Sequence, residues 1–290
     1  MFETSVSSDA SAHLIDRRSY LPWPTPSSLW PTYQHVLYLL PGQAYSLLLD
    51  DAGRPAGCTH YRNPGALSED LFLRFLFEQE ATLRQPYLRY EVLIGDVPFV
   101  LLPDALPSQG QELALARTLL DDAILPGELH RSPCPPEGAC ALFALLPARQ
   151  HLLDHYLPSY ELDHLSTACI RTAHRLADQT GHALTLTLSG RQVIITALAE
   201  GRLQLCNGYP YAEPLEAIYF MQSVRQITGL DQRELTCYVM GETNPADHQP
   251  SSLWHHLPGL QTPPLPGLLG IELPEKVPHW RFLFLGGKAG

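Results

Sequence analysis

Three short apolar runs separated by glycine turns lie between Ala183 and Tyr209, and they constrain the fold more than any other feature. From Leu184 to Leu188, leucine alternates with threonine, which is the period of a strand with one buried face. Gly190 and Gly201 lie where turns between successive strands are expected. The stretch therefore predicts a meander of three strands.

The same pattern occurs earlier in the chain. When the sequence is shifted by 148 residues, Val36–Tyr61 aligns with the second meander without a gap. Chance would give roughly one or two identities in such a window. The observed identities are Leu40 with Leu188, Gly42 with Gly190, Gly53 with Gly201, Arg54 with Arg202, Cys58 with Cys206 and Tyr61 with Tyr209. Two unrelated hairpins would also share turn glycines, but the register persists downstream. We therefore expect an internal duplication of a β-β-β-α-β unit.

The chain divides by this reading into a lead-in at residues 1–34, a first domain at 35–180 and a second domain at 181–290. Trp23 and Trp30 are expected to pin the proline-rich lead-in to the folded body. The periodicity of Glu161–Gln179 predicts a helix between the domains. The proline and glycine content of Arg131–Gly138 predicts a loop.

Composition excludes several classes of function. The net charge is −11, and lysine and arginine are not clustered, so we expect no nucleic-acid partner. No apolar run reaches the roughly 20 residues of a membrane span, so we expect no membrane insertion. The polar N-terminus does not resemble a secretory leader. Six scattered cysteines without a CxxC pair are typical of reduced thiols, and we expect a cytoplasmic protein.

Three segments resemble the DUF3822 family of uncharacterised bacterial proteins. They are GRLQLCNGYPY at Gly201–Tyr211, continuing into LEAIYFM, then PFVLLPDAL at Pro98–Leu106, and HYLPSYELDHLSTACI at His155–Ile170, with His164 at the histidine position of the family. The resemblance covers roughly residues 35–285. It implies an α/β fold of two actin-like (ribonuclease H-like) domains, each β-β-β-α-β, with two mixed sheets flanked by helices. It implies no activity.

The actin-like fold also implies where a nucleotide would bind. In this superfamily, phosphates contact the turn between the first two strands of each half, where backbone N–H groups face the anion. The corresponding residues are Gly42 and Gln43 in the first turn and Ser189, Gly190 and Arg191 in the second. Neither turn contains the Asp that would orient Mg²⁺ or water. We therefore expect a degenerate nucleotide site with no catalytic residue and no cofactor, and Mg-ATP is the alternative ligand.

Two other sets of residues suggest alternative functional sites. Asp96 and Glu242 follow the fourth strand of each half, where ligands of α/β folds gather, and could serve as displaced catalytic acids. His151 and His155 share a helix face and could bind zinc, but no third ligand is evident in the sequence. A solvated helix surface is the preferred interpretation of these histidines, and no metal site is expected.

The sequence thus favours a pseudo-ATPase, a catalytically silent actin-like protein that works by binding another protein. The competing hypothesis is an ATP-binding protein, an ATPase or a kinase with atypical catalytic acids.

Overall fold

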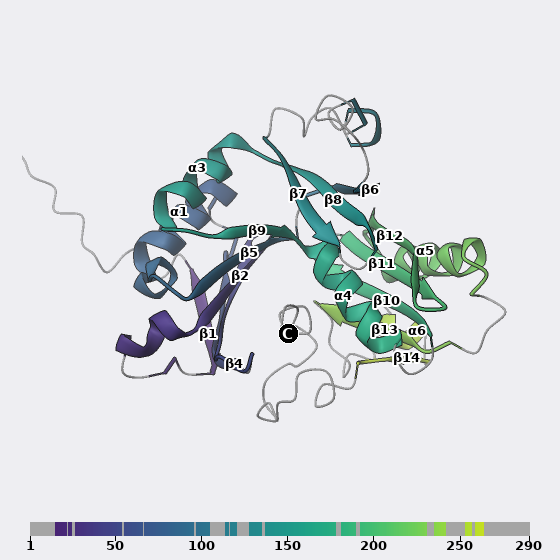
Figure 1. The fold of residues 1–290 in the computed structure, drawn as a ribbon, viewed down its shortest axis with the longest axis horizontal. Coiled ribbons are helices and arrows are strands. Elements are labelled where there is room, and N and C mark those ends of the chain that lie inside the picture. The colour runs from purple at the N-terminus through teal and green to yellow at the C-terminus, as the bar shows by residue number, and fades with distance from the viewer. Residues whose placement is uncertain are drawn as a thin grey trace, which may run out of the picture.

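In the described part of the computed structural model, three β-sheets pack around one buried helix (Figure 1). The structure describes residues 15–21, 23–24, 27–53, 55–65, 67–95, 97–104, 114–115, 117–120, 128–134, 137–177, 181–189, 192–230, 235–241, 253–256 and 259–263. The strands are β1 (Asp16–Leu21), β2 (Gln34–Leu40), β3 (Gln43–Leu49), β4 (Pro55–Arg62), β5 (Arg89–Ile94), β6 (Phe99–Pro103), β7 (Glu128–Cys134), β8 (Ala139–Leu145), β9 (Glu161–His164), β10 (His182–Ser189), β11 (Gln192–Ala199), β12 (Arg202–Pro210), β13 (Cys237–Gly241) and β14 (Leu260–Gln261). The α-helices are α1 (Glu69–Gln79), α3 (Pro147–Tyr156), α4 (Leu165–Ala177), α5 (Pro214–Ile227) and α6 (Leu253–His256), and η2 (Ser27–Thr32) and η3 (Ala81–Arg84) are 3₁₀ turns. Within these ranges, we find no helix with the length and apolar character that a membrane crossing requires.

Apart from the additional edge strand β1, the two large sheets have corresponding strand orders. The first sheet runs β1-β4-β3-β2-β5-β9, and the second runs β12-β11-β10-β13-β14. The first strand of each meander pairs antiparallel with the second strand of the meander and parallel with the strand that follows the meander and a helix. Strand β2 pairs in this way with β3 and β5, and β10 pairs in this way with β11 and β13. Strands β2 and β10 begin 148 residues apart, the offset of the sequence repeat. The two mixed sheets are thus as predicted, while their origin by duplication and the domain boundary at residue 181 stay predictions.

A third, small sheet is inserted between β5 and β9, with the order β6-β8-β7. Its edge strand β7 includes Arg131–Cys134, so the predicted loop at Arg131–Gly138 is wrong over these residues. The strand forms because it pairs along its length with the apolar strand β8. Pro133 is tolerated because β7 is an edge strand, where one side of the backbone needs no partner.

The helix predicted over Glu161–Gln179 begins later than its periodicity indicated. Residues 161–164 form β9, and α4 begins at Leu165. Strand β9 pairs parallel with β5, with Glu161 opposite Glu91, and Glu161 also pairs with Arg89. Pairing with a strand some 70 residues away in the sequence thus overrides a local helical pattern, which is a weak determinant by itself.

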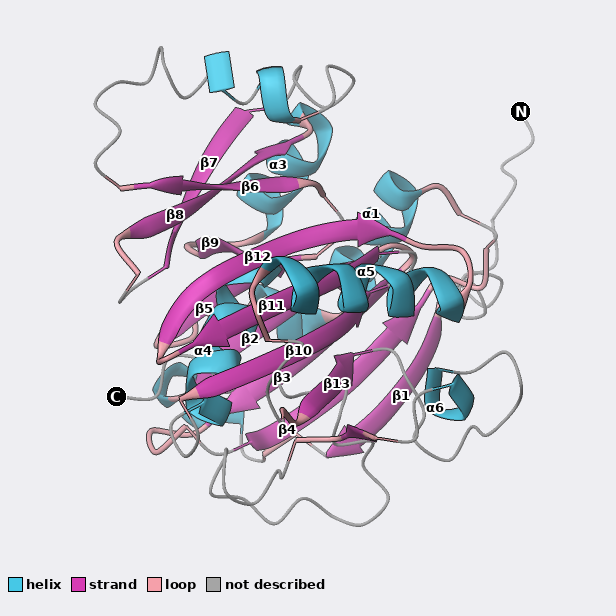
Figure 2. Cartoon of the chain, turned by 90° about the vertical axis from the view of Figure 1, so that its right-hand side faces the viewer, coloured by secondary structure: helices cyan, strands magenta, loops and turns pink. Residues whose placement is uncertain are grey.

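Helix α4 lies between the sheets and is buried on nearly every side. It packs against β10 and β11 of the second sheet, where the Cys169 Sγ lies 3.3 Å from the Thr187 Oγ1. On the other side it contacts β7 and β9. Helix α5 covers the opposite face of the second sheet (Figure 2), so that helices cover both faces of this sheet.

Part of the lead-in also joins the first sheet. Strand β1 pairs antiparallel with β4 at the edge of the sheet, which the polar sequence of this segment did not indicate. Trp23 donates its indole N–H to the Thr59 hydroxyl at 3.0 Å and packs edge-on against Trp30. The expected attachment of the lead-in through its tryptophans is therefore confirmed.

Gly241 is a backbone position that other residues should not tolerate. Its φ is +89°, and a Cβ atom there would lie 2.1 Å from the carbonyl oxygen of Leu188 on the paired strand β10. We expect Gly241→Ala to lower the free energy of unfolding by at least about 2 kcal/mol, measured by urea denaturation. Gly229→Ala is the matched control, because Gly229 has a φ of +68° but no heavy atom within 4 Å of its added Cβ. It should cost only about 1 kcal/mol, and equal losses would contradict the steric explanation.

Candidate functional site

The first turn predicted to bind phosphate joins β2 to β3 at Gly42. The backbone N–H of Gly42 donates a hydrogen bond of 3.0 Å to the Oε2 of Glu69, the first residue of α1. The guanidinium of the buried Arg149, on α3, lies 3.6 Å from the Oε1 of the same carboxylate. A turn of this kind attracts anions through its N–H groups. Here a carboxylate of the chain itself already accepts that N–H.

The other described residues of the predicted site are also engaged within the protein. The Oε1 of Gln43 lies 2.9 Å from the Nε2 of His60. Ser189, at the end of β10, is buried, and its hydroxyl donates to the carbonyl of Gly95 at 3.1 Å. Because Gly95 follows β5 and Ser189 ends β10, this hydrogen bond joins the first sheet directly to the second.

The remaining candidates from the sequence are not all described. Gly190 and Arg191 of the second turn, and the alternative acids Asp96 and Glu242, lie outside the described residues. The nucleotide site therefore stays a prediction.

The two histidines of α3 do lie near each other. Their rings are 6.3 Å apart, and Asp154 between them accepts hydrogen bonds from Gln150 and Tyr160. Across the described ranges, no cluster of three or more His, Cys, Asp or Glu side chains is arranged to hold a metal ion. The structure thus supplies no further ligand for His151 and His155 from those ranges.

His164, the histidine of the family resemblance, is a buried structural residue. Its Nδ1 accepts the backbone N–H of Ser166 at 3.0 Å, so that Nε2 carries the proton and donates to the carbonyl of Val97 at 3.1 Å. The rings of Phe99 and Phe143 pack against the imidazole. Burial lowers the pKa of His164 to about 4, so the ring is neutral at pH 7. Through its two hydrogen bonds, the ring links β9, the start of α4 and the segment before β6.

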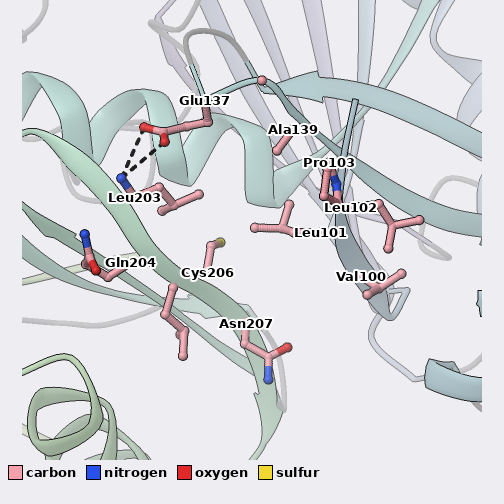
Figure 3. A pocket seen from close by; sticks show the side chains of 12 residues that line it. Val100, Leu101, Leu102, Pro103, Glu137, Ala139, Leu203, Gln204, Cys206 and Asn207 are labelled. Atoms are coloured by element: carbon pink, nitrogen blue, oxygen red, sulfur yellow. Dashed lines mark hydrogen bonds between the residues drawn. The ribbon is translucent and has the colours of Figure 1, made fainter. Parts of the chain in front are cut away.

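A cavity of about 620 Å³ lies between the small sheet and the second sheet (Figure 3). Its walls are residues 100–103 of β6, residues 203–207 of β12, and residues 137–139 in the turn and start of β8. Glu137 lines the cavity and connects its two walls. Its carboxylate accepts the backbone N–H of Leu203 at 3.2 Å and lies 2.5 Å from the Nε2 of His174 on α4. Sequence reasoning missed this cavity because its walls are about 100 residues apart in the chain.

Comparison with known proteins identifies the family. The model of DUF3822, described as a protein of unknown function, matches residues 44–257. The chain belongs to the DUF3822 family. No curated protein matches it in sequence.

Solved structures agree with the fold that DUF3822 membership implied. A Bacteroides thetaiotaomicron VPI-5482 protein with an actin-like ATPase fold and unknown function matches with a TM-score of 0.73 and 15% identity, over 86% of this chain and 100% of that one. The PilM–PilN type IV pilus biogenesis complex matches with a TM-score of 0.56 and 14% identity, over 87% of this chain and 96% of that one. The predicted actin-like fold is therefore confirmed, and these likenesses show the fold alone.

The carboxylate of Glu69 should contribute to stability through Gly42 and Arg149. We expect Glu69→Ala to lower the free energy of unfolding by about 1–3 kcal/mol, because a turn N–H and a buried guanidinium lose this acceptor. Glu69→Gln keeps an oxygen for Gly42 but removes the charge near Arg149, so its loss should be smaller. Urea denaturation of both variants measures the difference, and an unchanged Glu69→Ala protein would contradict the assignment.

Two buried histidines should make the fold sensitive to mild acid. Burial lowers the pKa of His35 to about 3 and that of His164 to about 4, from an ordinary 6.5. The unfolded chain then binds protons below pH 6.5 that the folded chain does not. Stability should be full above pH 6.5 and fall toward pH 4, by at most about 1.4 kcal/mol per pH unit for each histidine.

Urea denaturation of wild type and His164→Asn between pH 7.5 and 5 measures this effect. The variant starts from a lower stability at pH 7.5 but should lose less of it on acidification, because one titrating group is gone. Equal slopes for the two proteins would contradict the neutral, buried state of His164.

Proposed function

We propose that this protein is a non-catalytic, actin-like binding or scaffold module whose nucleotide site is degenerate. The observation that carries the proposal is the hydrogen bond from the Gly42 N–H to the Glu69 carboxylate. In a nucleotide-binding relative of this fold, a phosphate would be the acceptor at such a turn. Here the chain supplies its own anion, and Arg149 balances that charge.

A phosphate at this turn would have to compete with an intramolecular partner. Displacing Glu69 would leave its carboxylate near the incoming phosphate, and like charges at short distance repel. Ser189, the described residue of the second turn, supports the same conclusion, since its hydroxyl donates to Gly95 and is buried. Neither turn contains an Asp for Mg²⁺.

The cavity between β6 and β12 supports a role in binding another protein. It lies between two strands that end their sheets, and exposed edges of this kind are common sites of protein recognition. The PilM–PilN structure is a complex of type IV pilus biogenesis. That complex offers a precedent for a protein of this fold in a protein assembly, by analogy of fold alone.

Isothermal titration calorimetry with Mg-ATP and Mg-ADP tests the proposal. We expect no heat of binding to wild type at nucleotide concentrations up to about 1 mM. Glu69→Ala is the informative companion, because it removes the competing carboxylate but keeps the turn. Saturable binding by wild type would overturn the proposal and favour the ATP-binding alternative, and phosphate release by wild type would favour an ATPase.

A further inference from the structure

The two faces of the first sheet are covered by different parts of the chain. Residues opposite each other on paired strands share a face, so the register assigns each side chain to one side. Trp23 packs on one face, where its indole N–H donates to Thr59 and its ring lies 5.7 Å from that of His35. We call the other side the inner face. It carries Tyr38, Tyr45 and His60 in one row, and Val36, Leu47 and Cys58 in the next.

The inner face is shielded from water. Tyr38 is 1% exposed, Tyr45 is 2% exposed and His60 is 9% exposed. Their rings form a continuous row, with centroids 6.1 Å apart between the two tyrosines and 4.2 Å apart between Tyr45 and His60. Each of the three residues also interacts with a further group. The chain itself therefore supplies a layer over this face.

Helix α4 supplies that layer over one end of the sheet. Arg171 of α4 pairs with Glu91 on β5 and Asp163 on β9, and Figure 1 shows the helix beside these strands. A helix with its side chains is about 10–12 Å wide. Strand β4 is three strands away from β5, or about 14 Å at the usual strand spacing. One helix at β5 and β9 cannot also cover His60 on β4.

The segments outside the described residues differ in what they could bring to this face. Residues 1–14 and 242–252 are mostly polar, whereas twelve of the 27 residues at 264–290 are apolar. Trp280, Phe282 and Phe284 alternate, which is typical of an extended segment with one apolar side. Aromatic side chains on that side match the aromatic row of the inner face, because aromatic rings pack favourably against one another.

The end of the described chain is directed toward the inner face. Strand β14 runs parallel to β13 and pairs with it at Tyr238. Further along β13, Met240 is buried in the same apolar cluster as the tyrosines of the inner face. The chain leaves β14 in this direction. Seventeen residues separate Pro263 from Trp280 and can span about 55 Å when extended, so reach is not limiting.

Charge also favours a contact within the chain. The two lysines of the protein, Lys276 and Lys288, both lie in 264–290, where basic residues outnumber acidic ones by three to two. The whole chain has a net charge of −11. A weakly basic segment is therefore attracted to the acidic remainder of the same molecule.

We propose that residues 264–290 bind the inner face of the first sheet of their own chain, with Trp280, Phe282 and Phe284 against the row of Tyr45 and His60. The segment is an intramolecular ligand. It keeps the aromatic row out of water and closes this face to other partners until it is released.

Contact photocrosslinking of the full-length chain tests the proposal. We expect p-benzoylphenylalanine at Phe282 to form crosslinks within one molecule to inner-face residues of β3 and β4, mapped by mass spectrometry. The matched control places the same group at Tyr219 on α5, which is 68% exposed. The yield of inner-face crosslinks from Phe282 should be at least about tenfold higher, because benzophenone reacts only with groups in contact.

A second measurement uses charge to release the segment. Phe282→Asp with Phe284→Asp places two carboxylates where burial would cost their hydration. Fluorescence of the dye ANS should rise about threefold or more as the inner face is exposed. Gly286→Asp with Gly287→Asp adds the same charge beyond the alternating aromatics and should leave the fluorescence at the level of wild type.

Three crosslinking results would overturn the proposal. Phe282 could crosslink outside the inner face, or only to a second copy of the chain, which a denaturing gel detects as a dimer. The third is an inner-face crosslink from p-benzoylphenylalanine at Phe2 with none from Phe282, which would assign the cover to residues 1–14. These results do not depend on whether wild type binds nucleotide in the calorimeter.

Discussion

The position of every sheet depends on the burial of α4. Ten of its residues are buried, so this helix has no solvent face of the usual kind and must be packed from several sides. The second sheet packs against it through Cys169 and Thr187, and the hydroxyl of Ser132 on the small sheet donates to that of Thr167. The cavity walls belong to two sheets that both pack against this one helix.

Buried charges orient α4 more narrowly than apolar packing alone. Arg171 lies 3.3 Å from Asp163 on β9 and 3.7 Å from Glu91 on β5, and all three side chains are largely buried. Separating such groups from water is costly, and the cost is offset only when the partners stay in place. A rotation or a shift of α4 along β9 would break these pairs. The same network therefore holds the helix, and the sheets on either side of it, in one arrangement.

The sequence was informative where structure follows from neighbouring residues. The two meanders could be predicted because alternation and turn glycines such as Gly42 and Gly201 are local signals. Strand β9 could not, because its pairing partner β5 is remote and the apolar spacing of the segment continues that of the helix. The fold alone brings together the residues that form the Glu69–Gly42 contact and the cavity at β12. No local sequence pattern could therefore predict either feature.

The contacts between the two halves bear on how such a fold can work. A ligand changes a conformation only by the difference in its affinity for two states. In this protein, Ser189 donates to Gly95 across the two large sheets, and Glu137 ties the small sheet to Leu203. Groups of the chain itself thus join the two large sheets and the small sheet directly. An arrangement held in this way is compatible with the proposed binding role, because little ordering remains to oppose binding.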